Sequence, residues 1–536
     1  MALIVRSPYH NLDGPTGYWA YCGLDTLGTR QAFDVLEPQL DEEDRVIYNS
    51  GLAFQSFCLA MTLRGCLVDE VARVEAIKLR TKEEIEAIAA INAYPLIQEK
   101  WTTLGKRPVG DKCAKAEKGR HLWEPRAEAP ESQRCKYCDG PRLVGQAFNP
   151  HSPPQCMKLF YEILGFQKRY SKKGERKVTI DDDALEALAL KNTDYAEFID
   201  LFKSARAVRK QLGMLRSRLD SDGRWRATFN VDAAETGRMS SSKSPYRTGS
   251  NFQNIADKSR NIFVPDPGLE LWYADLEQAE SRIVAYDAEC AEDIRDHEAG
   301  DVHTGLVKRL WPELWARAGV PLQYKGVTPE DKAVASQPTP WDPSHDYRHY
   351  GKIIRHGTNI GMSHVGIARS AHIKQPEARK MREGYFSAYP NLRARQQDIR
   401  QEVRSAGLLI TPLGRKRRFL GRLWEEDTMK EGLAQTQQST IADVLNLAAW
   451  RIWYEMDGQL NIGSAPKPSD PNRVWVLGQI HDAVLGLRRI GDDDALRRVK
   501  EIMETPVIVR GKYVKIPTEI VVGQTWRKKD MTKWKG

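Results

Sequence analysis

The sequence of 536 residues has few of the features that mark secreted, fibrous or membrane proteins. Its 8 cysteines are scattered without a regular framework, which argues against a disulfide-stapled secreted protein. No uncharged apolar run is long enough to span a bilayer, and the apolar stretch before Arg6 is too short for a signal-peptide core. Internal repeats and long low-complexity tracts are also missing. We therefore expect a cytoplasmic globular protein without a membrane partner.

The composition supports a large folded core. Hydrophobic residues make up 41% and charged residues 29% of the chain, which is typical of globular proteins. At roughly 150 residues per domain, the length predicts about three or four domains. Lys and Arg outnumber Asp and Glu by 81 to 72, a net charge of +9 that permits a polyanionic partner without requiring one.

The pattern of apolar residues predicts an α+β protein with several domains. Helical spacing runs from Asp41 to about Ala93 and returns at 155–220, whereas residues 94–147 are rich in Pro, Gly, Lys and Cys and look like an insertion. Strand patterns occur at 220–290 and 470–525, with a mostly helical stretch between them. This order favours a sheet-containing centre with helical domains attached.

Two aspartates stand at expected strand ends. Asp275 closes the apolar run in "LWYADLEQAE", and Asp482 lies between two strand patterns in "GQIHDAVLG", where a tight turn would place His481 and Asp482 at the tip of a hairpin. Taken singly, Asp482 has an alternative as an ordinary turn residue and Asp275 as a helix N-cap. On neighbouring strands, the two carboxylates could instead bind two divalent cations about 3.5–4 Å apart, as phosphoryl transfer requires.

A basic segment could meet the phosphates of such a reaction. In "RHYGKIIRHGTNIGMS", Arg348 and Lys352 are four residues apart and share one face of a helix, and His356 continues nearly the same face. The alternative is a solvated basic helix face, which is the commoner meaning of such a run. The Gly-flanked "HGTNIGMS" that follows is an unusual ending for a surface helix.

Taken together and in order, these segments resemble the motifs of family A DNA polymerases. "ADLEQAESR" resembles motif A, "RHYGKIIRHGTNIG" resembles motif B, and "QIHDAVL" resembles motif C. The pieces "TGRMSSS", "NFQNI", "TPLGRKRR" and "QQSTIAD" match connecting segments of the same family. The resemblance spans about 18–530, broken by the insertion. It implies a right-hand fold with an antiparallel palm sheet, helical fingers and a helical thumb.

The resemblance also implies domain boundaries and roles for single residues. The domains are the C-terminal end of an exonuclease domain (1–45), the thumb (46–220, with the insertion 94–147), the palm (221–290 and 406–536) and the fingers (291–405). Asp275, the carbonyl of Leu276, and Asp482 would hold two Mg²⁺ ions. The expected nucleotide-binding residues are Arg348, Lys352, His356, Gln278, Glu280 and His481, with Lys352 also neutralising charge in the transition state and Glu280 excluding a 2′-OH. The expected contacts with primer–template DNA are Arg238, Asn251, Gln253, Asn254 and Gln438.

Three positions depart from the motifs of the family. His356 replaces a Phe or Tyr that packs on the nucleotide, and Ile360 replaces a Tyr beside the template base. Ala483 replaces the Glu that follows the metal-binding aspartate of motif C. These departures keep two rival functions open: a catalytically inactive factor that binds primer–template DNA, and a single-subunit RNA polymerase, against which Glu280 argues.

Two further features lie near the N-terminus. "YWAYCGLDTLGT" resembles the last motif of a 3′–5′ exonuclease at Tyr21 and Asp25, while the other acidic motifs have no counterpart before it. We therefore expect a phage-type replicative polymerase whose exonuclease is a separate chain; a lost exonuclease is the alternative. In the insertion, Cys113, His121, Cys135 and Cys138 could form a tetrahedral Zn²⁺ site, or could be reduced cysteines in a loop.

Overall fold

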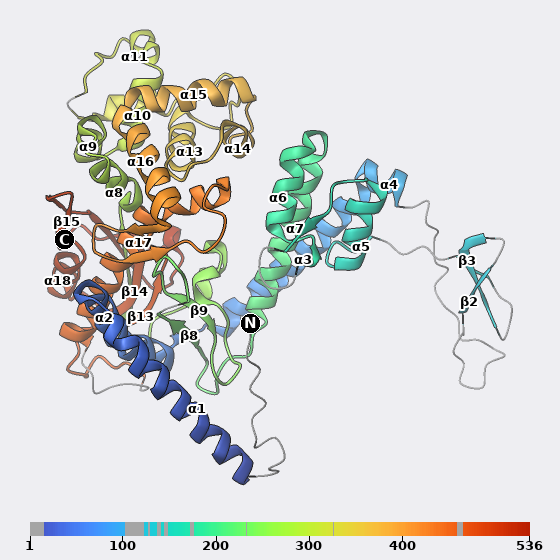
Figure 1. The fold of residues 1–536 in the computed structure, drawn as a ribbon, viewed down its shortest axis with the longest axis horizontal. Helices are drawn as coiled ribbons and strands as arrows, with labels where there is room; N and C mark the ends of the chain where they lie inside the picture. The colour runs from blue at the N-terminus through green and yellow to red at the C-terminus, as the bar shows by residue number, and fades with distance from the viewer. Residues whose placement is uncertain are drawn as a thin grey trace.

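A computed structural model describes residues 15–101, 123–126, 129–136, 141–143, 148–171, 176–231, 233–324, 326–457 and 465–536 (Figure 1). The α-helices are α1 (Pro15–Leu36), α2 (Glu42–Arg64), α3 (Glu70–Ala93), α4 (Pro95–Lys100), α5 (Pro153–Met157), α6 (Asp182–Lys191), α7 (Ala196–Leu215), α8 (Ala279–Asp287), α9 (Ala291–Glu298), α10 (Val302–Leu310), α11 (Glu313–Ala318), α12 (Pro329–Ala335), α13 (Tyr347–Asn359), α14 (His364–Ser370), α15 (Gln375–Ala388), α16 (Pro390–Ala406), α17 (Glu426–Ile452) and α18 (Asp493–Met503). The strands are β1 (Cys66–Leu67), β2 (Trp123–Arg126), β3 (Ala129–Cys135), β4 (Pro141–Leu143), β5 (Arg169–Tyr170), β6 (Val178–Thr179), β7 (Arg224–Trp225), β8 (Ala227–Asn230), β9 (Ser240–Lys243), β10 (Leu269–Leu276), β11 (Leu408–Ile410), β12 (Lys416–Arg418), β13 (Val474–Ile480), β14 (Ala483–Arg489), β15 (Val507–Val509), β16 (Lys512–Val514), β17 (Thr518–Gly523) and β18 (Thr532–Lys533).

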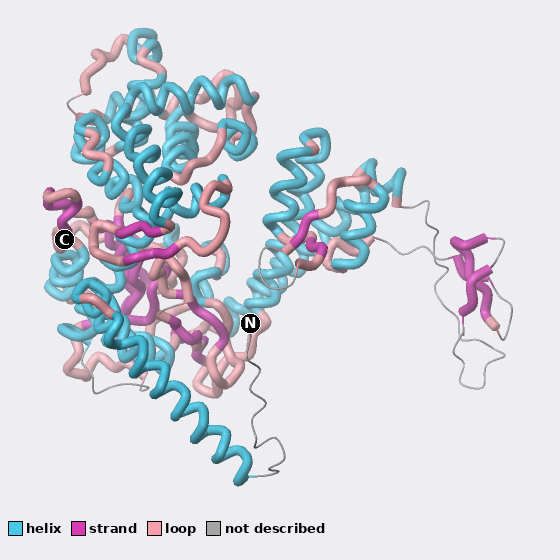
Figure 2. The backbone as a smooth tube through the Cα atoms, viewed as in Figure 1, coloured by secondary structure: helices cyan, strands magenta, loops and turns pink. Residues whose placement is uncertain are grey.

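An antiparallel sheet forms the centre of the molecule (Figure 2). Within the described residues its strand order is β13-β14-β10-β17-β18, so β10 lies between β14 and β17. Strand β10 from the region 220–290 thus meets β13, β14 and β17 from the region 470–525 in one sheet, as expected, while β7, β8 and β9 pair outside it. The expected α+β class is confirmed.

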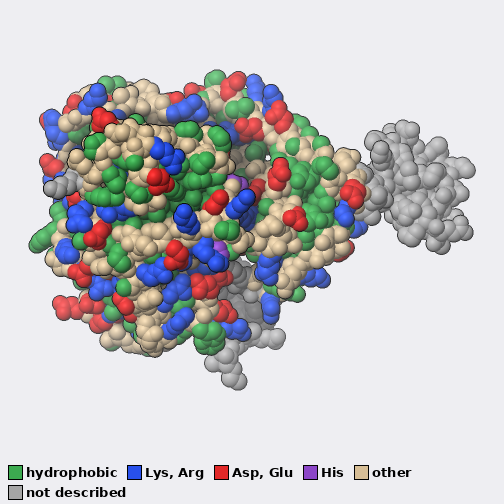
Figure 3. Space-filling model, turned by 90° about the horizontal axis from the view of Figure 1, so that it is seen from above, with side chains coloured by type: hydrophobic (Ala, Val, Ile, Leu, Met, Phe, Trp, Pro, Cys, Tyr) green, Lys and Arg blue, Asp and Glu red, His purple; other side chains and the backbone are tan. Residues whose placement is uncertain are grey.

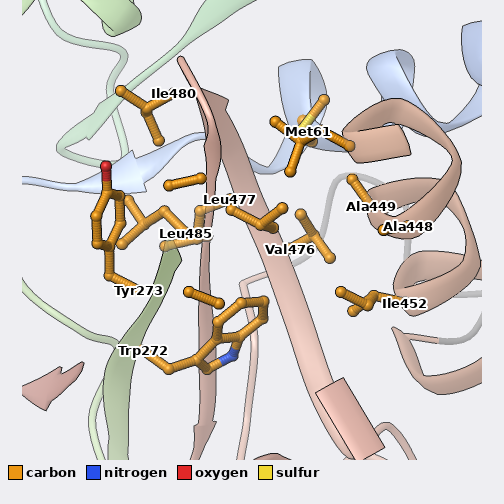
Figure 4. Close-up of a cluster of buried hydrophobic side chains, with 14 of the residues drawn as sticks. Met61, Trp272, Tyr273, Ala448, Ala449, Ile452, Val476, Leu477, Ile480 and Leu485 are labelled. Carbon is orange, nitrogen blue, oxygen red and sulfur yellow. The ribbon is translucent and has the colours of Figure 1, made fainter. Parts of the chain in front are cut away.

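The central strand is buried because both faces of the sheet are covered. Seven of the eight residues of β10 are buried, which explains its almost uninterrupted apolar sequence. On one face, α17 and α2 place Ala448, Ile452 and Met61 against Val476 of β13 (Figure 4). The packing is tight at Gly486, where a Cβ atom would lie 2.4 Å from Cζ2 of Trp272.

The helical run expected from Asp41 to Ala93 is divided into α2 and α3 by a sharp turn. Gly65 has a φ of +62°, and a Cβ atom there would lie 2.8 Å from the carbonyl oxygen of Trp225. The short strand β1 follows and pairs with β7. Glycine is needed here for both its conformation and its lack of a side chain.

By length and composition, α2 is apolar enough to cross a membrane. Its C-terminal half instead packs into the protein core through Phe54, Phe57 and Met61. At its end, the guanidinium of Arg64 lies 2.6 Å from the carboxylate of Asp457, and both side chains are buried. We interpret α2 as a core helix because a buried ion pair needs the partner that the fold provides here.

Two helical lobes flank the sheet. Helices α3 and α7 pack along each other in one lobe, whose own core includes Ile91, Leu185, Phe198 and Phe202. Helices α8 to α16 form the other lobe, which lies above the sheet in Figure 1. Seen from above, the surface is hollowed between these two parts, with histidine and basic side chains visible in the hollow (Figure 3).

Candidate active site

The two predicted catalytic aspartates lie at adjacent strand ends. Asp275 on β10 is the register partner of Ala483, the first residue of β14, and Asp482 directly precedes Ala483. The amide of Leu276 donates a hydrogen bond of 3.1 Å to the carbonyl of Asp482. As predicted, His481 and Asp482 form the tight turn between β13 and β14. The sheet therefore brings the two acids together although they are far apart in the chain.

The backbone around these acids has an unusual conformation. His481, beside one acid, and Gln278, between β10 and α8, both have a φ of +53°. Neither residue is glycine, and such left-handed residues are concentrated at functional sites. Burial, together with the positive charges of Arg260 and Arg238, lowers the pKa of His481.

A pocket of about 480 Å³ joins three of the predicted motifs. From the predicted set it is lined by Arg238, Leu276, Gln278, Glu280, Lys352, His356, His481 and Asp482. It is also lined by Ala279, Ser281, His303, Arg355, Asn359 and Gln437, to which the sequence motifs assign no role. The end of the sheet thus forms one wall of the pocket, and α13 forms another.

The acids in the pocket repel one another. Burial and the nearby charges of Glu280 and Asp275 raise the pKa of Asp482 to about 6, against the opposing effect of Arg238. The Oδ1 atom of Asp482 is buried without a hydrogen-bond partner and lies 3.6 Å from the guanidinium of Arg238. Arg238 itself forms an ion pair with Glu280. A bound cation would relieve this repulsion and occupy the unpartnered oxygen.

Helix α13 presents a free ammonium to the pocket. Lys352 is exposed, and within the described residues no carboxylate lies within ion-pair distance of it. The other Lys or Arg side chains on the pocket wall are paired: Arg238 with Glu280, and Arg355 with Asp293 at 2.6 Å. Among the described Lys and Arg side chains of the pocket wall, Lys352 is thus the one available to an anionic ligand.

Buried polar bonds fix the orientation of α13. Arg355 is almost fully buried and also donates to the hydroxyl of Tyr389 at 3.0 Å. Asn359, one helical turn further, accepts a hydrogen bond of 2.7 Å from Tyr385. Burial, with the positive charges of Arg355 and Arg348, lowers the pKa of His303 to about 3, so this pocket residue is neutral at physiological pH.

Several predicted residues do not line the pocket. The guanidinium of Arg348 lies 3.0 Å from the carboxylate of Asp301. The carboxylate of Asp275 forms an ion pair with Lys528, whose Nζ atom lies 3.1 Å from its Oδ2 atom. On α17 the buried neighbour Gln437 lines the pocket, and the predicted Gln438 is half-buried.

The side-chain amides predicted to bind DNA form hydrogen bonds with the protein near the β13–β14 hairpin. The side chain of Asn251 accepts hydrogen bonds from Ser241 at 2.9 Å and from the amide of Asn254 at 3.1 Å. The side chain of Gln253 donates to the carbonyls of Met239 at 2.9 Å and Gln479 at 3.1 Å. These residues therefore link the loop that carries Arg238 to β13.

The residues present fit a magnesium site of few protein ligands. Within the described residues, no group of three or more His, Cys, Asp or Glu side chains is arranged to hold a metal ion. Two carboxylates and a backbone carbonyl suffice for Mg²⁺, which keeps several of its waters. Asp275, Asp482 and the carbonyl of Leu276 are such a set, and the unpartnered oxygen of Asp482 favours a cation there.

The predicted zinc site falls mostly outside the described residues. Cys113, His121 and Cys138 lie outside the described residues, and Cys135 is described only as the last residue of β3. Zinc binding by these four residues stays a prediction from the sequence.

Comparison with known proteins identifies the relatives of the chain. The model of a family described as "DNA polymerase family A" matches residues 138–311 and 333–528. DNA polymerase I of Mycobacterium leprae (strain TN) is 25% identical over 484 residues, which cover 85% of this chain and 48% of that protein. DNA polymerase I of Lactococcus lactis subsp. cremoris (strain MG1363) is 25% identical over 517 residues, or 92% and 52%. The chain thus spans about half the length of these curated relatives.

A solved structure has a similar fold. It is described as the "POL domain of Pol1 from M. smegmatis complex with DNA primer-template and dNTP". The TM-score is 0.57 and the sequence identity 23%, and the match covers 89% of this chain and 70% of the other. At this identity the likeness shows a shared fold over most of this chain.

Proposed function

The chain belongs to DNA polymerase family A, and from that premise we propose that it is a DNA-directed DNA polymerase that extends the 3′-OH of a primer with dNTPs and releases pyrophosphate. One observation carries the proposal. Asp275 and Asp482 stand at adjacent strand ends, and the free ammonium of Lys352 faces the same end of the sheet across the pocket. Nucleotidyl transfer needs carboxylates that can bind metal cations and a cationic side chain that can bind a triphosphate.

Asp275, Asp482 and the carbonyl of Leu276 would hold two Mg²⁺ ions. Bound there, the ions would activate the primer 3′-OH and neutralise the leaving pyrophosphate. The protein contributes the fixed positions of the two carboxylates, which the pairing of β10 with β14 determines. It also favours a cation beside Asp482, because the negative charges of Glu280 and Asp275 lie near that carboxylate.

The incoming nucleotide would lie along α13. Lys352 and Arg348 would bind the triphosphate, the latter by leaving Asp301, and His356 would stack on the nucleotide or donate to a phosphate. Glu280 would stand beneath the sugar, where a 2′-OH would collide with it. Gln278 and His481 would line the nucleotide and the primer end.

The primer–template duplex would enter the hollow between the two helical lobes. Arg238, Asn251, Gln253, Asn254 and Gln438 would contact it through phosphates and the minor groove, where all base pairs present similar acceptors. On this proposal, residues 46–220 are the thumb, 291–405 the fingers, and 221–290 with 406–536 the palm. The similar solved structure is a complex with DNA primer-template and dNTP, which supports the same ligands for this chain.

A primer-extension assay with dNTPs and NTPs tests the proposal. We expect the wild type to add dNTPs and to discriminate strongly against NTPs. Glu280→Ala should weaken that discrimination by roughly 10- to 100-fold, because the group that collides with the 2′-OH is removed. Glu277→Ala is the matched control, since that nearby acid lines a different pocket.

The same assay separates the rival functions. Equal use of NTPs and dNTPs by the wild type would indicate a single-subunit RNA polymerase. Binding of primer–template DNA without any extension would indicate an inactive replication factor. Either outcome would contradict the proposal.

We further propose that a separate 3′–5′ exonuclease chain docks on α1. This helix carries the exposed apolar side chains Leu27, Phe33 and Leu36, with exposed fractions of 54%, 41% and 59%. Asp25, the acid of the exonuclease-like motif, is exposed on the same helix. Exposed apolar side chains on an outlying helix suit a protein partner.

Gel filtration with an exonuclease encoded by a neighbouring gene tests this docking. We expect the two chains to co-elute at micromolar concentration, and Leu27→Glu with Phe33→Glu to separate them. Val71→Glu is the control, because Val71 is 76% exposed on α3, away from α1. Separate elution of the wild-type chains would contradict docking.

A role in bacteriophage replication stays a prediction, since the relatives named above are bacterial proteins.

A further inference from the structure

Asp275 has a neighbour that the expected mechanism does not use. The Nζ atom of Lys528, the first residue of a short 3-10 helix that follows β17, lies 3.1 Å from Oδ2 of Asp275. The same Nζ atom lies 3.1 Å from Oε2 of Glu519 on β17. One ammonium group therefore bridges carboxylates on two neighbouring strands.

The register of the sheet explains this bridge. Asp275 is the direct partner of Ala483 on β14 and of Glu519 on β17. Residues directly opposite each other in antiparallel strands point to the same face of the sheet. Ala483, Asp275 and Glu519 thus form one row, in which β14 contributes no charge and β17 contributes an acid.

Glu519 can hold Lys528 without the help of Asp275. Its other oxygen, Oε1, lies 3.1 Å from the Nζ atom of Lys533, so its carboxylate is fixed by two lysines. The side chains of Lys528 and Asp275 are 44% and 36% exposed, so their contact is open to water and to ions. A small rotation of the lysine would release Asp275 while its bond to Glu519 remains.

We propose that Lys528 is a built-in counter-ion of Asp275, which competes with the divalent cation for this carboxylate and withdraws to Glu519 when the cation binds. The proposal rests on the proposed function, because it takes Asp275 to be a metal ligand. Lys528 is then a positioning residue. It holds Asp275 before the metal arrives, and it sets the metal concentration at which the site fills.

The physical reason is the repulsion between two cations that share one carboxylate. The attraction of a carboxylate for a divalent ion falls when a fixed positive charge stays within a few ångströms. Mg²⁺ sites with only one or two carboxylates have little charge to spare, so a nearby ammonium changes their affinity strongly. Removing the ammonium should therefore tighten metal binding.

The test is a titration of the full chain with Mn²⁺ in the absence of DNA and dNTP. The electron paramagnetic resonance signal of free Mn²⁺ measures how much of the metal ion is bound. Mn²⁺ prefers the same oxygen ligands as Mg²⁺. We expect Lys528→Met to lower the dissociation constant by about fivefold or more, since it removes the competing charge. The Mg²⁺ concentration for half-maximal primer extension should fall in parallel.

Lys533→Met is the matched control. It removes the same charge from the same Glu519 but has no ion pair with Asp275, and we expect its dissociation constant to stay within about twofold of wild type. Glu519→Gln should weaken Mn²⁺ binding, because Lys528 loses its alternative partner. Circular dichroism would check that each variant is folded.

The outcomes separate this inference from the proposed function. If Lys528→Met binds Mn²⁺ like the wild type, or if Lys533→Met tightens binding as much, the role of Lys528 is wrong. If Asp275→Asn leaves both Mn²⁺ binding and primer extension unchanged, the metal site of the proposed function is wrong. Loss of both in Asp275→Asn, with tighter binding only in Lys528→Met, would support the two together.

Discussion

Asp275→Asn is expected to reduce primer extension by at least about a thousandfold and to leave primer–template binding nearly unchanged. The amide keeps the shape of the side chain and its place in β10, but it removes the negative charge that would bind both metal ions. Metal ions stabilise the transition state of phosphoryl transfer by several kcal/mol, and each 1.36 kcal/mol corresponds to about a factor of ten in rate. Asp482→Asn should have a similar effect.

Single-turnover extension and a gel-shift assay with the same primer–template measure the two quantities. Glu277→Gln is the matched control: it makes the same chemical change two residues from Asp275, where the side chain lines a different pocket, and it should keep near wild-type activity. An Asp275→Asn variant that retains a tenth of wild-type activity would contradict the assignment of the metal site. A variant that no longer binds DNA would show that Asp275 has a structural role instead.

The pair of acids could be predicted from the sequence because each acid is marked locally. An apolar strand with Asp275 beside its last residue, and a hairpin turn at His481 and Asp482, are patterns of a few residues. That the two acids meet on adjacent strands is what the resemblance to family A polymerases implies, and β10 and β14 do pair in this register. Local spacing also predicts part of α13: residues four apart share one face of a helix, and Lys352 and His356 both lie on the pocket wall.

The ion pairs around the site could not be predicted in this way. Lys528 reaches Asp275 because β17 lies beside β10, and no local pattern encodes which strand becomes that neighbour. Arg348 is expected at the triphosphate and pairs with Asp301 in this structure, across α10 and α13. Such contacts between distant segments depend on side-chain positions that are set only by the complete fold.

Helical phase explains a smaller difference. The motif "QQSTIAD" predicts a DNA contact at Gln438, and the structure places its neighbour Gln437 on the pocket wall. Adjacent residues on a helix point about 100° apart, so Gln437 faces the pocket and the half-buried Gln438 points to another side, where contact with DNA stays a prediction. The sequence also gives no sign of the role of Arg355. This residue lies beside His356 in a basic run, and only its burial against Asp293 distinguishes it from a surface arginine.

Lys352→Ala is expected to lower the rate of nucleotide addition by about 100- to 1000-fold. Of the Lys and Arg residues on the pocket wall, Lys352 is the one without a carboxylate partner among the described residues, so its charge is not already neutralised within the protein. A fixed charge beside the reacting phosphate stabilises the negative charge that develops in the transition state. The loss should appear mainly in the maximal rate, with a smaller change in the half-saturating dNTP concentration.

Arg348→Ala provides the comparison within the same helix. Because Arg348 must leave Asp301 before it can bind a phosphate, part of its attraction for the nucleotide is offset, and its removal should cost less in rate than removal of Lys352. Rapid-quench measurement of single-nucleotide addition at several dNTP concentrations would compare both variants with the wild type. A Lys352→Ala enzyme that adds nucleotides at the wild-type rate would show that the free ammonium of α13 does not face the triphosphate. An Arg348→Ala enzyme more impaired than Lys352→Ala would indicate that the nucleotide breaks the ion pair with Asp301 and that Arg348, once released, is the main phosphate ligand.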